Sequence, residues 1–265
     1  MQPSVPQIFN TALVSLRAAR LNAARTEALH VAIAEHLADR IADIARPLPA
    51  LAELVGYRAY APHAVHTLTL DTQEYLSSVA APMDGIVSAL VLHRVNDVLG
   101  AMIQLRRALK PDGVLLCVLP GANTLRELRQ VFAEVESELY GGISPRVSPF
   151  LEVRDAGNLL QRAGFALPVV DSDTVTLTYP SLRDCMRELR ALGESNILHE
   201  RRSHFTSRAF FAAAEARYKK RFGMADGKIP VTIELLTLTA WAPDASQPKP
   251  AARGSGKVSL KQFLE

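Results

Sequence analysis

The most constraining feature of this sequence is a pair of buried strands joined by one helix. A nearly continuous apolar run over 84–92 predicts a strand that is covered on both faces. Apolar residues at every third or fourth position predict a helix over 98–109, capped by Asn96 or Asp97, and a Pro-Asp-Gly turn then leads into a second apolar run over 114–119. Strand, helix, turn and strand in this order form a βαβ unit, which requires a parallel sheet with a right-handed crossover.

The composition is that of a folded chain of ordinary size. Of the 265 residues, 48% are apolar and 22% are charged, which excludes disorder, collagen and a disulfide scaffold. The net charge of +3 gives no reason to expect nucleic acid as a partner. No apolar stretch is long enough for a transmembrane segment. Cys117 and Cys185 lack metal-ligand spacing, so we expect reduced thiols and no metal site.

The rest of the pattern places the βαβ unit within a larger domain. We expect an N-terminal helical segment over 1–46, a domain over 47–242 that includes a helical cap at about 124–221, and a flexible tail over 243–265. The periodicities predict further helices over 26–45, 124–140, 155–163, 181–192 and 207–221, and further strands over 64–70, 175–178 and 233–241.

The first residues carry positive charge only. Arg17, Arg20 and Arg25 all precede the first acid, Glu27. Such a start is typical either of a mitochondrial transit peptide or of an ordinary N-terminal helix in a cytoplasmic protein. We expect a bacterial cytoplasmic protein, with the mitochondrial matrix as the alternative. Peripheral contact of this helix with a membrane surface is a further hypothesis.

Several motifs carry a resemblance to a known family. The stretches 84–97 and 109–114 resemble strand four, the following helix and strand five of class I S-adenosylmethionine-dependent methyltransferases. The motifs that narrow this resemblance to the complex I assembly arginine hydroxylases of mitochondria and their bacterial relatives are 8–10, 123–128, 144–150, 193–196, 226–232 and 252–259. That family is similar in turn to the malonyl-carrier-protein methyltransferases of biotin synthesis. The resemblance implies a Rossmann-like α/β fold, S-adenosylmethionine as cofactor, and a protein partner.

One region departs from the family pattern. A cofactor-binding member has a glycine-rich turn after its first strand, where relatives read Leu-Asp-Leu-Gly-Cys-Gly, because glycines let the backbone approach the ligand. Here the corresponding stretch, 50–60, has Gly56 as its one glycine. Its neighbours are bulky, namely Val55, Tyr57, Arg58 and Tyr60. The ribose hydroxyls of the ligand also need an acid at the end of the second strand, and Asp71 and Glu53 are the candidates that remain.

The spacing of the elements indicates a shortened front half. Only about thirty residues separate Leu51 from Asp84, which is the length of a single βαβ unit. The intact fold places three strands and three helices in this interval. We therefore predict an α/β, Rossmann-like class I methyltransferase fold with a shortened N-terminal half of the sheet and a helical cap.

The candidate site residues fall into two groups. The candidates for cofactor binding are Glu53, Gly56, Asp71 and Ser88, although Gly56 fits an ordinary turn glycine better than a cofactor glycine. The candidates for catalysis are His93, Glu194, Ser195 and Asn196. His93 follows a parallel strand at the edge where ligands bind, or it is a histidine packed between apolar neighbours. The polar stretch 193–196 shapes a substrate or partner face, or it is a helix end followed by a new start.

Two basic segments are also distinct in the sequence. His199, Arg201, Arg202 and His204 suit either an acidic partner or a phosphate, or they form a solvated loop. The run over 217–221 fits the solvated face of a helix.

These observations lead to a binding protein as the expected function. The patterning of the sheet and cap is intact, whereas the glycines and the acid that hold the ligand are not, and a fold can outlast its site. We expect a pseudoenzyme without a cofactor, whose partner is a respiratory complex subunit or an intact homologue. The alternative is an active methyltransferase or hydroxylase that uses S-adenosylmethionine in a rebuilt pocket.

Overall fold

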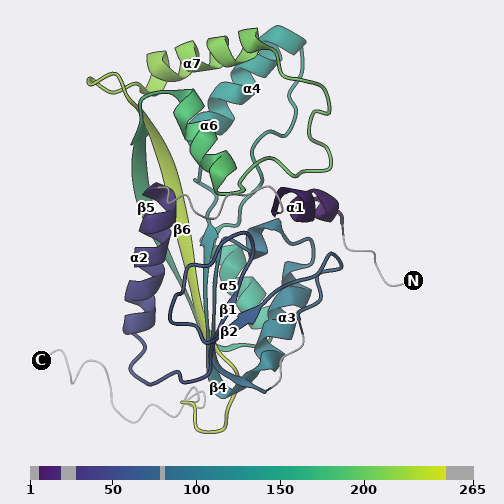
Figure 1. The fold of residues 1–265 in the computed structure, drawn as a ribbon, viewed down its shortest axis with the longest axis vertical. Helices are drawn as coiled ribbons and strands as arrows, with labels where there is room; N and C mark the ends of the chain where they lie inside the picture. Colours follow the sequence, from purple (N-terminus) through teal and green to yellow (C-terminus); the bar gives the residue numbers. More distant parts are fainter. Residues whose placement is uncertain (1–5, 19–27, 78–80, 249–265) are drawn as a thin grey trace, which may run out of the picture.

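A six-stranded sheet forms the centre of this computed structural model, which describes residues 6–18, 28–77 and 81–248 (Figure 1). The strand order is β2-β1-β3-β4-β6-β5. The strands are β1 (Leu51–Leu54), β2 (His66–Leu68), β3 (Met83–Ala89), β4 (Leu109–Pro120), β5 (Ala166–Tyr179) and β6 (Ile229–Trp241). The first four are parallel to one another, and β6 runs antiparallel to both β4 and β5.

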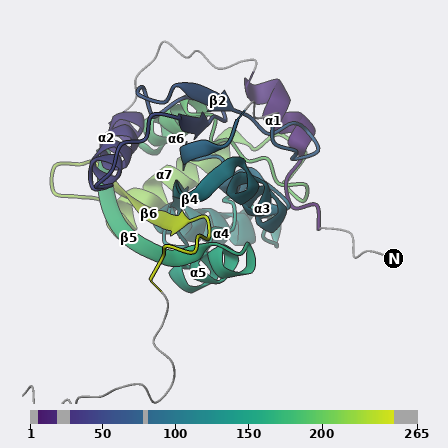
Figure 2. The ribbon, with the colours of Figure 1, turned by 90° about the horizontal axis from the view of Figure 1, so that it is seen from below.

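Helices cover both faces of the sheet. The α-helices are α1 (Thr11–Ala18), α2 (Ala28–Ala42), α3 (Val98–Ala108), α4 (Arg126–Tyr140), α5 (Val153–Arg162), α6 (Leu182–Ala191) and α7 (Arg208–Phe222). Figure 2 shows α2 on one side of the sheet, with α3 and α5 on the other. The alternation of side chains along β4 explains this layering, since Leu116 and Val118 join the core under α2, while Leu115 and Cys117 join the core under α3 and α5.

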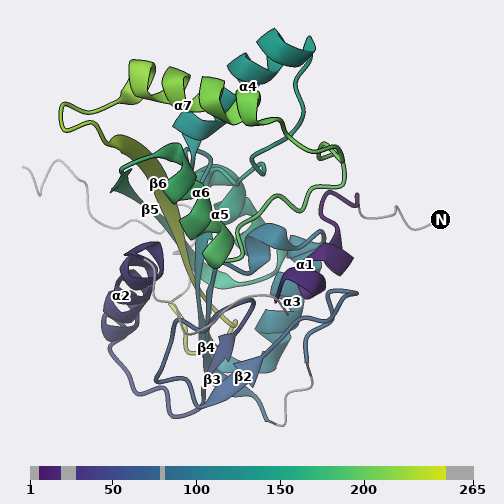
Figure 3. The ribbon, with the colours of Figure 1, turned by 45° about the horizontal axis from the view of Figure 1, so that its top comes forward.

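A helical cap stands above the carboxyl ends of the parallel strands. β5 and β6 form a long hairpin that carries α6 and α7 at its far end, and α4 packs against α7 (Figures 1 and 3). Buried carboxylates connect the cap to the sheet. Glu127 of α4 accepts a hydrogen bond from the backbone N–H of Thr232, and Glu234 accepts one from the N–H of Asn123 at 2.8 Å. The motifs 123–128 and 226–232 therefore join the cap to β6.

The N-terminal half of the sheet is short, as the spacing predicts. The eleven residues from Val55 to Val65, between β1 and β2, contain no helix. Between β2 and β3, the described residues form turns and isolated bridges. The α/β class and the shortened front half are confirmed, and the sheet has six strands.

Most expected elements are present with shifted ends. Asp97 rather than Asn96 caps α3, since its side chain accepts a hydrogen bond from the Gly100 N–H. The strand expected at 175–178 is longer and begins at Ala166. It lies at the edge of the sheet, where exposed residues alternate with partly buried ones, so no apolar run marks its first part in the sequence. The turn expected at 111–113 lies inside β4, where Asp112 has a φ of +58° and the register to β3 shifts.

Several expectations concern residues with little structural description. Arg20 and Arg25, and the tail from residue 249 onward, lie outside the described residues. Among the described helices, none is long and apolar enough to span a membrane. Both cysteines are free and buried, and burial raises the pKa of the Cys117 thiol to about 12. The described residues contain no group of side chains suited to hold a metal ion.

The packing of α2 yields a first prediction. The Leu37 side chain is fully buried against the sheet, whereas Val31 on the same helix is 38% exposed. Leu37→Ala should lower the free energy of unfolding by about 2–5 kcal/mol, because it leaves a cavity in the core. The control, Val31→Ala, should change it by less than about 0.5 kcal/mol. Urea unfolding measures both values, and equal losses would contradict this packing.

Candidate functional site

Two cavities lie at the carboxyl edge of the parallel strands. One cavity of about 100 Å³ lies between the end of β3, the cap and the loop 193–197, and we call it the cap cavity. The other, of about 180 Å³, lies where β1 and β2 end, and we call it the edge cavity. The ends of parallel strands are where α/β folds bind their ligands.

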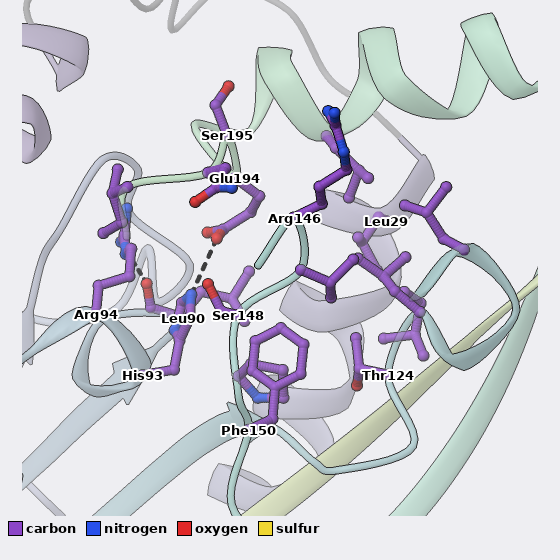
Figure 4. Close-up of a pocket in the computed structure, with 18 of the residues that line it drawn as sticks. Leu29, Leu90, His93, Arg94, Thr124, Arg146, Ser148, Phe150, Glu194 and Ser195 are labelled. Carbon is purple, nitrogen blue, oxygen red and sulfur yellow. Dashed lines mark hydrogen bonds and ion pairs between the residues drawn. The ribbon is translucent and has the colours of Figure 1, made fainter. Parts of the chain in front are cut away.

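The cap cavity brings together all four candidate catalytic residues, namely His93, Glu194, Ser195 and Asn196. Its remaining wall is largely apolar and includes Leu29, Ile33, Leu125, Leu128, Phe150, Ile233 and Leu235. Figure 4 shows the side chains of Phe150, Thr124 and His93 around one end of it. The cavity thus combines an apolar body with a few polar groups, which is the usual make-up of a ligand site.

A hydrogen-bonded pair of a histidine and a glutamate lies at the centre of this group. His93 follows β3 in a short 3-10 turn (Leu92–Arg94), and its Nε2 lies 2.9 Å from Oε2 of Glu194, in the loop after α6 (Figure 4). Burial alone would raise the pKa of Glu194, but the charges of His93 and Arg94 and the hydrogen bond from His93 outweigh it and lower that pKa. Because the ionised carboxylate only accepts hydrogen bonds, His93 donates from Nε2. Its Nδ1 is buried and has no hydrogen-bond partner within the described residues.

Ser195 and Asn196 fix the position of their loop. The Ser195 carbonyl accepts a hydrogen bond from Nη1 of Arg17 at 2.6 Å, which connects α1 to the loop. Asn196 donates from Nδ2 to the Pro145 carbonyl at 2.8 Å and accepts from the Leu198 N–H at 3.0 Å. The geometry of Asn196 is therefore that of a positioning residue.

The sequence reasoning missed Arg146, which lies in the wall of the cap cavity. Its Nη2 donates to Oε1 of Glu136 at 2.8 Å, and its guanidinium lies 4.3 Å from the ring centroid of Phe210. Glu136 also accepts hydrogen bonds from the N–H and hydroxyl of Ser144. The signal for Arg146 was its place inside the motif 144–150, which connects two parts of the cap.

Two of the cofactor candidates line the edge cavity, but each serves its own surroundings. Gly56 and Asp71 follow β1 and β2. The Asp71 carboxylate accepts hydrogen bonds from the N–H groups of Gln73 and Tyr75, at 2.8 and 2.9 Å. Glu74 is a second acid in the wall of this cavity. Its carboxylate accepts hydrogen bonds from the backbone N–H groups of Asn96 and Asp97, the two residues directly before α3.

The other two cofactor candidates line neither cavity. The buried Glu53 accepts hydrogen bonds from the N–H groups of Tyr60 and Ala61, at 2.6 and 3.1 Å, and burial raises its pKa. It therefore holds the loop after β1 in place. Ser88 is fully buried inside the sheet, in register with Cys117.

Arg94 stands between the two cavities and lines both of them. Its guanidinium lies 3.8 Å from the ring centroid of Tyr57, and its Nη2 donates to the Leu90 carbonyl. A Cβ atom at Gly56 would lie 2.7 Å from Nη2 of Arg94, so the glycine makes room for the arginine. Gly193, with a φ of +88°, makes room for the Tyr57 ring in the same way. The sequence signal was a charged residue inside the apolar stretch 91–95.

Two residues that line the cap cavity have a strained backbone. Leu90 and Leu125 both line it, and both adopt positive φ values, +52° and +56°. Bulky residues rarely adopt this conformation, which costs about 1–3 kcal/mol. The backbone N–H groups of both leucines are held by carbonyls of the sheet, at Val118 and Thr232. Such strain persists where the surrounding structure enforces it.

Comparison with known proteins gives the family. Residues 16–168 match the family model of a methyltransferase domain. The arginine-hydroxylase NDUFAF5 of Mus musculus is 36% identical over 260 residues, which covers 88% of this chain and 76% of the mouse protein. The chain belongs to the NDUFAF5-like methyltransferase family. Its Danio rerio member is 41% identical over 188 residues, and the malonyl-[acyl-carrier protein] O-methyltransferase of Xylella fastidiosa is 42% identical over 163 residues.

Coverage differs between these family members. The matches cover 71% of this chain and 58% of the Danio rerio protein, and 62% of this chain and 53% of the Xylella fastidiosa protein. The chain thus spans little more than half the length of these two relatives. The stretch aligned with the mouse protein is 260 residues long but takes in only 88% of the 265 residues here, so part of it has no counterpart in this chain.

The cap wall yields a second prediction. Burial alone would raise the pKa of Glu136, but hydrogen bonds from Arg146 and Ser144 outweigh it and lower that pKa. Glu136→Gln should cost about 3 kcal/mol at pH 7, because it leaves the Arg146 charge without its partner. Since the folded-state pKa is the lower one, this cost is full above about pH 4.5 and shrinks as the pH falls through the folded-state value.

Unfolding of both proteins in urea from pH 3 to pH 7 measures this difference. The matched control is Glu138→Gln on the same helix, where the carboxylate is 59% exposed and pairs with Arg217. It should have a much smaller effect. A Glu136→Gln difference that stays constant down to pH 3 would contradict the assignment.

Proposed function

We propose that this chain is a binding protein built on a methyltransferase fold, which engages a partner protein at the cap cavity and does not turn over S-adenosylmethionine. The observation that carries the proposal is the position of Arg94, stacked on Tyr57 between the two cavities. Methyl transfer needs the donor in one cavity to reach the acceptor in the other. A packed guanidinium lies on that path.

Charge supports the same conclusion. S-adenosylmethionine carries a positive sulfonium, and Arg94, which is only 8% exposed, would bring a second positive charge close to it. Like charges at short range in a low-dielectric site repel strongly.

The groups that would hold the nucleoside are also engaged elsewhere. Asp71 and Glu74 both line the edge cavity, and each carboxylate already accepts hydrogen bonds from two backbone N–H groups. A ribose would compete with these contacts on both oxygens of Glu74, whereas on Asp71 both fall on Oδ1. The loop after β1 offers Gly56 alone, and the Arg94 side chain takes up the space that this glycine leaves. The residues present therefore do not fit the cofactor of the family.

The cap cavity, in contrast, keeps the properties of a binding site. It holds the His93–Glu194 pair, a buried Nδ1 without a partner in the described residues, and two strained leucines. Strain and buried charge are retained where a function requires them. We propose that a side chain of the partner enters this cavity. Relatives are named as arginine hydroxylases, so an arginine of the partner is a candidate occupant.

The resemblance to complex I assembly arginine hydroxylases points to the class of partner protein. We propose a respiratory complex subunit or an intact homologue of this chain. Relatives include proteins named as mitochondrial and a bacterial methyltransferase. We place this chain in a bacterial cytoplasm, with the mitochondrial matrix as the alternative.

A second candidate function is catalysis in a rebuilt pocket. The observation that favours it is the His93–Glu194 pair, because a histidine oriented by a carboxylate can act as a general base through its other nitrogen. In that case the active protein would be a methyltransferase or hydroxylase that uses S-adenosylmethionine.

Calorimetric titration separates the two functions. The purified chain is titrated with S-adenosylmethionine and with S-adenosylhomocysteine, and an intact methyltransferase is titrated in parallel with the same ligand stocks. Because Arg94 and Tyr57 take up the space, we expect no saturable heat at ligand concentrations up to about 1 mM. Saturable binding at micromolar concentrations would refute the pseudoenzyme.

Capture from the native cell tests the cap cavity itself. Ser148 lines this cavity, so Ser148→Phe should fill it and exclude the side chain of the partner. The control, Ser246→Phe, lies near the end of the described residues and lines neither cavity. We expect at least one protein to be captured by the wild type and the control but reduced more than fivefold with Ser148→Phe. Identical captured sets for all three would count against binding at the cavity.

A further inference from the structure

Two basic segments that are far apart in the sequence meet in the structure. Phe9 pairs with Leu198 in an antiparallel bridge, and the His199 N–H donates to the Ile8 carbonyl at 2.9 Å. This bridge sets the segment before α1 against the loop that follows α6, and Figure 3 shows α1 beside that loop. The arginine of α1 thereby joins the basic residues near 190–202.

Three arginines surround this one loop. Arg17 donates from Nη1 to the Ser195 carbonyl at 2.6 Å, and Arg201 donates from Nη1 to the Leu198 carbonyl at 2.9 Å. Arg190 lies in the last turn of α6, directly before the loop. The three come from three different parts of the chain, yet each adjoins the loop 193–198.

These arginines lack acidic partners. Within the described residues, none of the three forms an ion pair with a carboxylate. Burial lowers the pKa of Arg17, Tyr57 opposes this, and the positive charges of Arg201 and Arg190 lower it further. Glu194, the acid within the loop 193–198, is bound to His93, and Glu200, which directly precedes Arg201, forms no ion pair with any of the three within the described residues. Like charges repel one another, so a group of arginines without a counter-charge is stabilised when an anion binds to it.

The cluster lies at the rim of the cap cavity. Leu189, Ser195 and Ile197 line that cavity. Leu189 directly precedes Arg190, the Ser195 carbonyl accepts from Arg17, and Ile197 directly precedes Leu198, whose carbonyl accepts from Arg201. We propose that Arg17, Arg190 and Arg201 form an anion-binding rim that holds an acidic segment of the partner protein. This inference rests on the proposed function, in which a side chain of that partner enters the cavity.

The setting favours a protein segment over a flat lipid surface. Arg17 and Arg201 are half-buried, and hydrogen bonds to backbone carbonyls hold them against the loop. They are thus recessed beside a cavity, where an extended chain can reach both features at once. Arginine also suits carboxylates, because its planar guanidinium can donate two parallel hydrogen bonds.

Fluorescence anisotropy with a labelled hexaglutamate peptide tests the rim on the full chain at low salt. We expect saturable binding, no binding of hexalysine, and weaker binding as salt is added. Arg17→Gln, Arg190→Gln and Arg201→Gln should each weaken binding at least threefold, and the triple variant at least tenfold. The matched control is Arg183→Gln, an exposed arginine on α6, and it should stay within twofold. Thermal unfolding confirms that each variant is folded, and the Arg190 side chain forms no hydrogen bond or ion pair within the described residues.

Two competitors distinguish other sources of the anion. Inorganic phosphate that displaces the peptide at micromolar concentration would overturn the proposal in favour of a small anion. Vesicles of phosphatidylglycerol that bind the wild type but not the triple variant, without hexaglutamate binding, would overturn it in favour of a membrane. An effect of Arg183→Gln equal to the others would also overturn it. Cofactor binding in the calorimetric titration would refute the pseudoenzyme and leave the peptide result unchanged.

Discussion

The packing of the Arg94 guanidinium on the Tyr57 ring is the interaction on which the rest of the site depends. It requires glycine at two places, since Gly56 gives room to the arginine and Gly193 gives room to the ring. The charge of Arg94 also helps to lower the pKa of Glu194, whose carboxylate then accepts the hydrogen bond from Nε2 of His93. One buried cation thus sets the shape of the edge cavity and the electrostatics of the cap cavity.

The fold and the site differ in what holds them together. Glu127 and Glu234 join the cap to β6 through buried hydrogen bonds, and Glu136 joins two parts of the cap through Arg146. These contacts involve three of the motifs that resemble the family, 123–128, 144–150 and 226–232, and they are independent of any ligand. A chain can therefore keep the family's fold while the cofactor region changes, which is the pattern that the proposed function describes.

Much of the fold could be predicted because the spacing of apolar residues along the sequence reflects which side chains are buried. The alternating and helical patterns predict β3, α3 and β4, and the count of residues before Asp84 predicts the shortened half of the sheet. The functional site was harder to predict from the sequence than the fold. That His93 meets Glu194 across a hundred residues depends on the cap, and nothing local encodes it. Glu53 was a candidate for the ribose because of its position in the chain, but its carboxylate binds the loop after β1 instead. Arg94 was missed because an arginine next to a histidine in an otherwise apolar stretch does not reveal its partner, the Tyr57 ring.

The most direct test of the central claim is a crystal structure of the protein grown in excess S-adenosylhomocysteine. The account predicts that Arg94 remains stacked on Tyr57 and donates to the Leu90 carbonyl, with no nucleoside density between the ends of β1 and β2. A nucleoside seated over Gly56, with its ribose on Asp71 and the Arg94 side chain turned away, would contradict it.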